Sequence, residues 1–163
     1  YHAEEAQALV WELKYYGNKR AAALAGEILS EELLAIASEE LGRPLLVPVP
    51  MHKTRRRERG HNQTELLCES ALGFSELSSK AYDYAPHALT RIKHTPEQQK
   101  LDRTTRLKNV AGSMQVENPE LVEGRVCVVV DDVTTTGATL NEAERALKAA
   151  GARRVHTLAL AQS

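Results

Sequence analysis

The spacing of hydrophobic and polar residues changes along the chain and predicts helices first, then strands. Residues 4–16 and 21–41 place apolar and charged side chains at helical spacing, so we expect two helices, the second ended by Gly42. Short apolar runs at 45–49, 88–92, 126–130 and 155–161 predict strands. The polar stretch 93–109 between them is expected to be a mobile loop.

Two helix starts are marked by capping signals. Asn62 is followed three residues later by Glu65, which predicts a helix to about Leu72. Thr139 and Glu142 repeat the pattern and predict a helix to Ala150, followed by Gly151 as its C-terminal glycine. Strands that alternate with helices predict an α/β fold with a mainly parallel sheet. We expect one domain over 1–163, with a helical segment 1–42 and a core 45–163.

Composition narrows the class of protein. The chain has 163 residues, of which 42% are hydrophobic and 26% charged, as in ordinary globular domains. Its apolar runs are far shorter than the roughly 20 residues of a membrane span, so we expect no membrane segment, no signal peptide and no membrane partner. Cys68 and Cys127 sit in apolar contexts, which predicts buried thiols and a reducing, cytoplasmic location. The chain begins with Tyr1 and not with methionine, which is consistent with a fragment of a longer protein.

Charge is concentrated in two basic segments. The formal net charge is −1, yet residues 52–59 carry five basic side chains against one acidic one, and residues 91–108 carry six against two. Two basic segments on an otherwise acidic chain favour a small anionic ligand, although two solvated loops would show the same pattern.

The segment 128–139 holds the clearest candidate site. An apolar strand ends in Asp131 and Asp132, and a turn rich in threonine with Gly137 leads into a helix. Ligands of open α/β sheets bind at this edge, and the amides of a helix N-terminus favour a phosphate. Carboxylates accept hydrogen bonds from sugar hydroxyls. The pattern therefore predicts a 5-phosphoribosyl ligand; the alternative is a capped turn whose aspartates are merely solvated.

This segment resembles the 5-phosphoribosyl 1-diphosphate signature of type I phosphoribosyltransferases. The order of further pieces resembles the ComF-type (competence protein F-like) subgroup: 14–17, 47–50, 55–57, 59–63, 66–67, and Thr95, Gln98, Leu101, Arg106, Asn109 and Gly112. The resemblance covers essentially the whole chain. Two departures stand out, since His61 replaces an aromatic residue and the four-cysteine zinc module of many members is absent. We expect no metal bound directly by the protein.

The resemblance also implies roles for single residues. The ribose 5-phosphate group would be bound by Asp131, Asp132, Thr134, Thr135, Thr136, Gly137, Ala138 and Thr139. The pyrophosphate group would be bound by Lys53, Arg55, Arg56, Arg103 and Arg106. Asp131, Asp132 and His61 are the candidate catalytic residues, and His94 is a second histidine that could move protons. Thr135 stands where some purine-using relatives carry an aspartate, so no dedicated base is evident.

The implied activity is that of a glycosyltransferase of nucleotide metabolism. A Mg²⁺-dependent phosphoribosyltransferase would move the phosphoribosyl group from 5-phosphoribosyl 1-diphosphate to an unidentified nitrogenous acceptor and release pyrophosphate, with the Mg²⁺ bound through ligand and water near Asp131 and Asp132. Two alternatives stay open. One is a regulatory module that binds this ligand without catalysis, and the other is a competence or DNA-uptake accessory protein with single-stranded DNA or uptake machinery as partner. A homodimer is also left open.

Overall fold

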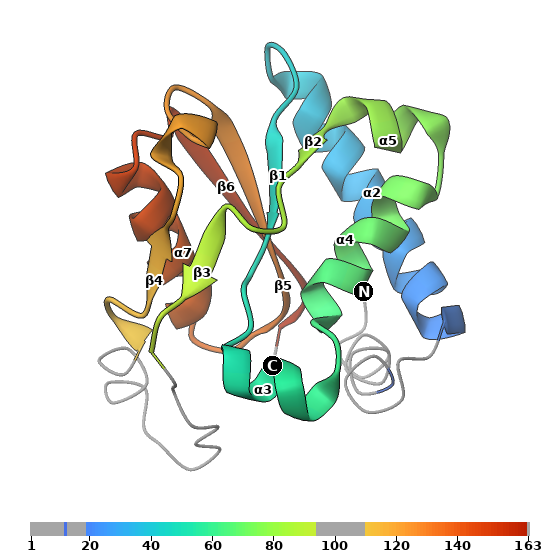
Figure 1. Ribbon diagram of the computed structural model, residues 1–163. Coiled ribbons are helices and arrows are strands. Elements are labelled where there is room, and N and C mark those ends of the chain that lie inside the picture. Colours follow the sequence, from blue (N-terminus) through green and yellow to red (C-terminus); the bar gives the residue numbers. More distant parts are fainter. Residues whose placement is uncertain (1–11, 13–18, 94–109, 163) are drawn as a thin grey trace.

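The computed structural model describes residues 12, 19–93 and 110–162, and these form an α/β fold around one parallel sheet (Figure 1). The sheet has the strand order β2-β1-β5-β6. Every neighbouring pair in it is parallel. Its strands are β1 (Leu45–Pro48), β2 (Asp83–Tyr84), β5 (Val126–Thr134) and β6 (Arg154–Gln162). The predicted fold class is confirmed.

Helices cover both faces of this sheet. One face carries α2 (Lys19–Glu39) and α4 (Gln63–Gly73), with α5 (Glu76–Ala81) beside them (Figure 1). The other face carries α7 (Ala138–Ala149) and an antiparallel pair, β3 (Leu89–Arg91) with β4 (Met114–Val116). A short 3₁₀ helix, η1 (Pro119–Leu121), leads into β5. The helix expected over 21–41 is confirmed as α2, whereas the helix expected over 4–16 lies outside the described residues except for Glu12.

The two central strands explain why their sequences are continuously apolar. Leu45 and Val47 of β1 face α7, and Leu46 between them faces α2 and α4. Strands buried on both faces need no polar side, so β1 and β5 read as unbroken hydrophobic runs. Cys68 and Cys127 are free and buried in these two layers, as predicted, and burial raises the pKa of the Cys127 thiol to about 11.

The first basic segment, residues 52–59, forms a helix and not the solvated loop that its charge pattern also allowed. Helix α3 (Lys53–Arg59) starts after His52, whose Nδ1 accepts a hydrogen bond from the Thr54 amide at 3.3 Å, and it ends at Gly60 with φ 80°. Arginine and lysine are good helix formers, and this run contains no apolar residue to signal a helix by periodicity. The elements α5, β2 and β4 were also missed, since each is only two to six residues long.

The structure corrects two boundaries around the Asp pair. Strand β5 does not stop at Val130, because its pairing with β6 continues through Asp131 to Thr134, opposite Gln162. Helix α7 is not capped by Thr139; Gly137 is its N-cap residue, without a side-chain cap. The predicted partner Glu142 is used elsewhere.

Glu142 joins α7 to the β3–β4 pair. Its carboxylate accepts hydrogen bonds from the Met114 amide at 3.1 Å and from Arg145 at 2.8 and 2.9 Å, and Arg145 also donates to the Met114 carbonyl at 3.2 Å. The Glu142 side chain is 5% exposed. Burial alone would raise its pKa, but the bonds from Arg145 and from backbone amides hold the pKa down at about 2.

We expect Glu142→Ala to destabilise the fold by about 1–3 kcal/mol, because the buried Met114 amide loses its acceptor. The ionised form is bonded in the folded state, so wild-type stability should fall as pH drops from the ordinary glutamate range toward 2, and the variant should lack this dependence. Denaturant unfolding at pH 7 and pH 3 measures both effects. Glu144→Ala, on the same helix and paired only with Lys148, is the control and should change stability by less than about 0.5 kcal/mol. Equal losses in the two variants would contradict the expectation.

Candidate functional site

A polar cavity of about 180 Å³ opens at the carboxyl ends of β1 and β5. Asp131 and Asp132 of β5 line it, together with residues from the β1–α3 connection, from α3, and from the start of α4. Arg91 reaches it from β3. The cavity therefore lies at the sheet edge where ligands of α/β proteins bind.

The Asp pair is held by hydrogen bonds within its own strand. Asp131 Oδ1 accepts from the amide of Asp132 at 2.9 Å, and Asp132 Oδ1 accepts from the amide of Val133 at 2.7 Å. A third bond comes from Gln63 Nε2, which donates to Asp132 Oδ2 at 3.2 Å. Both aspartates are only 7% exposed. These bonds fix two buried carboxyl groups side by side at the floor of the cavity.

Asp131 holds its proton more tightly than an ordinary aspartate does. Burial, and then the neighbouring Asp132, raise the pKa of Asp131 to about 8, while Arg91 acts in the opposite direction. Burial and a nearby carboxyl group both disfavour the charged form of an acid. The cavity thus contains a carboxyl group, that of Asp131, for which the protonated form is unusually favourable.

Three arginines surround this floor. Arg55 and Arg59 project from α3 into the same cavity as Arg91. Burial lowers the pKa of Arg91, Asp131 raises it, and Arg55 lowers it, so the three charged groups act on one another. The predicted contact residue Arg55 is therefore at the cavity, and the sequence prediction missed Arg59 and Arg91. Arg91 was noted only as the first charge of a basic segment, because the sequence did not show that β3 turns toward the Asp pair.

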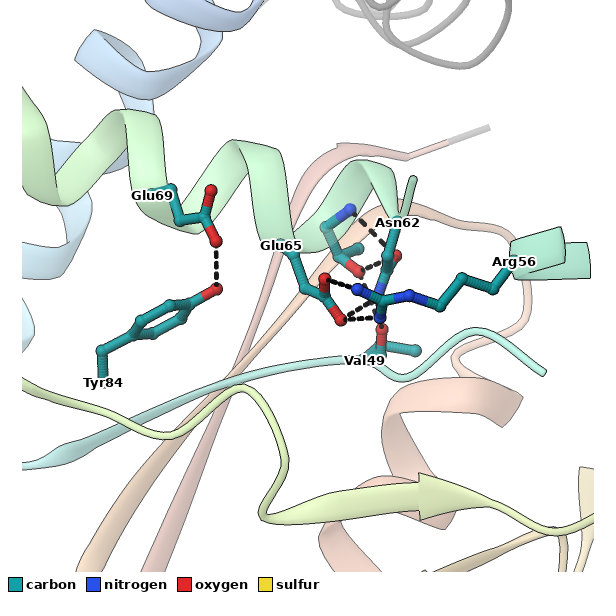
Figure 2. Close-up of polar contacts among 7 residues, drawn as sticks. Val49, Arg56, Asn62, Glu65, Glu69 and Tyr84 are labelled. Carbon is teal, nitrogen blue, oxygen red and sulfur yellow. Dashed lines mark hydrogen bonds and ion pairs between the residues drawn. The ribbon is translucent and has the colours of Figure 1, made fainter. Parts of the chain in front are cut away.

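Other predicted residues lie elsewhere. Arg56 does not line the cavity; its Nη1 and Nη2 pair with Glu65 Oε1 and Oε2 at 2.5 and 2.8 Å (Figure 2). For Arg56, the expected pyrophosphate contact is thus replaced by an ion pair within the chain. Lys53 is exposed and His61 is partly exposed, and neither lines the cavity, whereas His52 does. His94, Arg103 and Arg106 lie outside the described residues.

The predicted phosphate loop borders a second hollow. Residues 134–137 and Gln162 line a space of about 500 Å³, and Thr139, in the first turn of α7, lines the Asp cavity. Gly137 has φ 74°, a left-handed conformation that glycine adopts without strain. The Ala138 amide, at the start of α7, donates weakly to Thr136 Oγ1 at 3.4 Å. The loop and the Asp pair thus border two adjacent open spaces.

The described part of the chain contains no group of three or more acidic, histidine or cysteine side chains that could hold a metal ion. A metal at this site would therefore need oxygens from its ligand. Among the described helices, none combines the length and the apolar character that crossing a membrane requires.

The chain has clear relatives among known proteins. A family model described as "Phosphoribosyl transferase domain" matches residues 20–163. The protein called "DNA utilization protein YhgH" of Salmonella typhi is 33% identical over 158 residues, which cover 95% of this chain and 66% of that protein. "Competence protein F" of Haemophilus influenzae is 35% identical over 121 residues, covering 72% and 50%. The chain thus spans half to about two thirds of the length of these relatives.

Among solved structures, a hypoxanthine phosphoribosyltransferase from Trypanosoma cruzi, in complex with the product IMP, superposes with a TM-score of 0.52. The two chains are 12% identical, and the match covers 86% of this chain and 63% of that one. At this identity the likeness concerns the fold alone.

Proposed function

Because this chain belongs to the ComF-type branch of the type I phosphoribosyltransferases, we propose that it binds 5-phosphoribosyl 1-diphosphate and transfers the phosphoribosyl group to a nitrogenous acceptor, releasing pyrophosphate. The observation that carries this proposal is the buried Asp pair at the floor of a cavity whose walls bear Arg55, Arg59 and Arg91. The buried thiols of Cys68 and Cys127 support a reducing compartment, the cytoplasm.

Each part of the ligand has a matching surface. The 5-phosphate would bind the open loop 134–137 through backbone amides and threonine hydroxyls. The ribose hydroxyls would donate to the Asp pair, and the diphosphate would lie among the three arginines. Each charge-assisted hydrogen bond contributes about 1.5–3 kcal/mol.

The chemistry follows from this placement. The C1–O bond of the ribose breaks and its electron pair leaves on pyrophosphate, while the acceptor nitrogen forms the new C1–N bond and loses its proton to water. The sugar becomes positively charged in the transition state, as in glycoside chemistry generally. The carboxyl oxygens of the Asp pair would favour that cation, and the arginines would neutralise the leaving group.

The oxygen-rich floor fits magnesium in a limited way. Asp131 and Asp132 offer the oxygen ligands that Mg²⁺ prefers, and an ion with few protein ligands is normally completed by phosphate oxygens and water. Such an ion would neutralise charge on the departing pyrophosphate.

Calorimetric titration of the full chain with 5-phosphoribosyl 1-diphosphate tests the proposal. Asp132→Asn should weaken binding by about tenfold or more, because a ribose hydroxyl loses its charged acceptor. Asp83→Asn, at the edge strand β2 where Asp83 pairs with Arg43 and Arg125, is the matched control and should leave binding unchanged. Unchanged affinity in Asp132→Asn would remove the Asp pair from the site.

Turnover separates catalysis from sensing. We expect pyrophosphate release in the presence of one member of a panel of nucleobases and amines. Tight binding without release on any acceptor would instead support the regulatory module, an alternative that stays open because no base is evident at Thr135.

A DNA-linked function is the second candidate. It is supported by the relatives named for DNA utilization and competence, and by the exposed Lys53 and Arg57 on the basic helix α3. Single-stranded DNA binding that is lost in Lys53→Ala/Arg57→Ala but kept in Asp131→Asn would favour this function, because neither basic residue lines the cavity. DNA binding absent from the wild type would exclude it.

A further inference from the structure

Gln63 has a buried hydrogen-bonding atom that the chain does not satisfy. It is the first residue of α4, is 7% exposed and lines the cavity. Its Nε2 donates to Asp132 Oδ2 at 3.2 Å, whereas its Oε1 is buried and has no hydrogen-bond partner among the described residues. An unsatisfied buried acceptor costs about 1–3 kcal/mol, so this position favours a donor that the described residues do not supply, such as a group of the ligand.

The backbone that carries Gln63 is firmly held (Figure 2). On one side of it Asn62 Nδ2 donates to the Val49 carbonyl at 3.2 Å, and on the other side Thr64 Oγ1 donates to the same carbonyl at 2.7 Å. Glu65, one residue further, is fixed by the two bonds from Arg56. The first turn of α4 is therefore tied to the end of β1, and the freedom left to Gln63 is mainly rotation of its terminal amide, which has a broad and shallow torsion.

The amide of Gln63 matches the chemistry of a sugar diol. An amide offers NH donors beside a carbonyl acceptor, and each hydroxyl of a diol is both donor and acceptor. A hydroxyl that donates to Asp132 Oδ2 would lie next to this amide, because Oδ2 is already bonded to Nε2.

We propose that Gln63 binds a ribose hydroxyl of the ligand together with Asp132, and so selects ribose over deoxyribose phosphates. This inference rests on the proposed function and adds to it a residue that distinguishes sugars. When the diol enters, one hydroxyl donates to Asp132 Oδ2 and the neighbouring hydroxyl donates to Gln63 Oε1, which thereby gains the donor that it lacks. Sites whose buried polar groups are completed only by the correct ligand reject analogues that lack the hydroxyl.

Gln63→Met tests the role because it keeps the length of the side chain and removes both polar atoms. The probes are ribose 5-phosphate, its 2-deoxy and 3-deoxy forms, and inorganic pyrophosphate, titrated by calorimetry into the full chain. We expect the wild type to prefer ribose 5-phosphate over one deoxy form by about tenfold, and Gln63→Met to lose most of that preference. Affinity for pyrophosphate, which has no hydroxyl to offer, should not change.

The control is Gln115→Met, the same substitution at an exposed position of β4, and it should keep the wild-type preference. A second variant, Gln63→Glu, keeps the acceptor for the hydroxyl but cannot donate to Asp132, and should keep more of the preference than Gln63→Met does. Thermal unfolding without ligand should change little in Gln63→Met, since the variant removes the unsatisfied Oε1, which offsets the loss of the 3.2 Å hydrogen bond to Asp132.

Two results would overturn the inference. One is a Gln63→Met variant that weakens all four probes equally, which indicates a structural role. The other is a variant that keeps the ribose preference. A wild-type chain that binds no ribose phosphate would overturn the proposed function itself, and the inference with it.

Discussion

Replacing Gly137 with valine should abolish binding of 5-phosphoribosyl 1-diphosphate. Gly137 has φ 74° at the start of α7, and a β-branched residue avoids this conformation. Space does not forbid the side chain, because the nearest atom to an added Cβ is Asn141 Nδ2 at 3.7 Å. The backbone would instead leave its left-handed conformation and turn the loop amides away from the phosphate. Loss of two such hydrogen bonds lowers affinity by about a hundredfold or more.

Gly124→Val is the matched control for this experiment. Gly124 has φ 70° with no atom within 4 Å of an added Cβ, and it lies at the turn before β5, away from both hollows. Both variants should lower the unfolding temperature, and calorimetry should show binding only in Gly124→Val. Retained binding in a folded Gly137→Val would place the phosphate elsewhere.

Asp131→Asn should stabilise the unliganded fold while it weakens ligand binding. Burial and Asp132 raise the pKa of Asp131 to about 8, so between the ordinary aspartate pKa and pH 8 the folded state holds a proton that the unfolded state has released. Wild-type stability therefore falls as pH rises through this window. Asparagine keeps an acceptor for the Asp132 amide and has no proton to lose. The unfolding temperature of the variant should exceed that of wild type most at pH 8, by about 2–4 °C for each kcal/mol gained.

Thermal unfolding of both proteins at pH 4, 6 and 8 measures this difference. The gain should shrink toward pH 4, where the carboxyl group begins to be protonated in the unfolded state as well. The control is Asp83→Asn, the same substitution at an aspartate that pairs with Arg43 and Arg125. Its unfolding temperature should not exceed that of wild type at any pH. An Asp131→Asn variant less stable than wild type at pH 8 would contradict the assigned protonation. The expected opposition of stability and binding is typical of functional sites.

The parts of the fold that the sequence predicts correctly are those with a strong local pattern. The central strands are recognisable as continuous apolar runs because both of their faces are buried. Asn62 marks the start of α4, where its Oδ1 accepts a hydrogen bond from the Thr64 amide. The sequence analysis singled out the Asp pair and Gly137 as candidate site residues because they belong to one short, contiguous motif. The prediction that Thr139 caps α7 is wrong, because the capping pattern in the sequence does not reveal that Glu142 is bonded to the Met114 amide instead.

The residues that the sequence does not predict reach the site from distant segments. Arg91 lies 40 positions before Asp131 and meets it only because β3 packs on the α7 side of the sheet. Arg55 and Arg56 are neighbours in sequence, but the helix directs one to the cavity and the other to Glu65. Which arginine faces the cavity depends on the orientation of the helix, and a run of like charges in the sequence does not predict that orientation.

The bond between Glu142 and β4 has a mechanical consequence. Helix α7 begins at the loop 134–137, and β3, which pairs with β4, carries Arg91. Because Glu142 bonds β4 to α7, we expect a displacement of the β3–β4 pair to be transmitted to α7 and to the loop that precedes it. A ligand whose phosphate ends bound Arg91 and the loop amides would then hold the β3–β4 pair and α7 in one relative position.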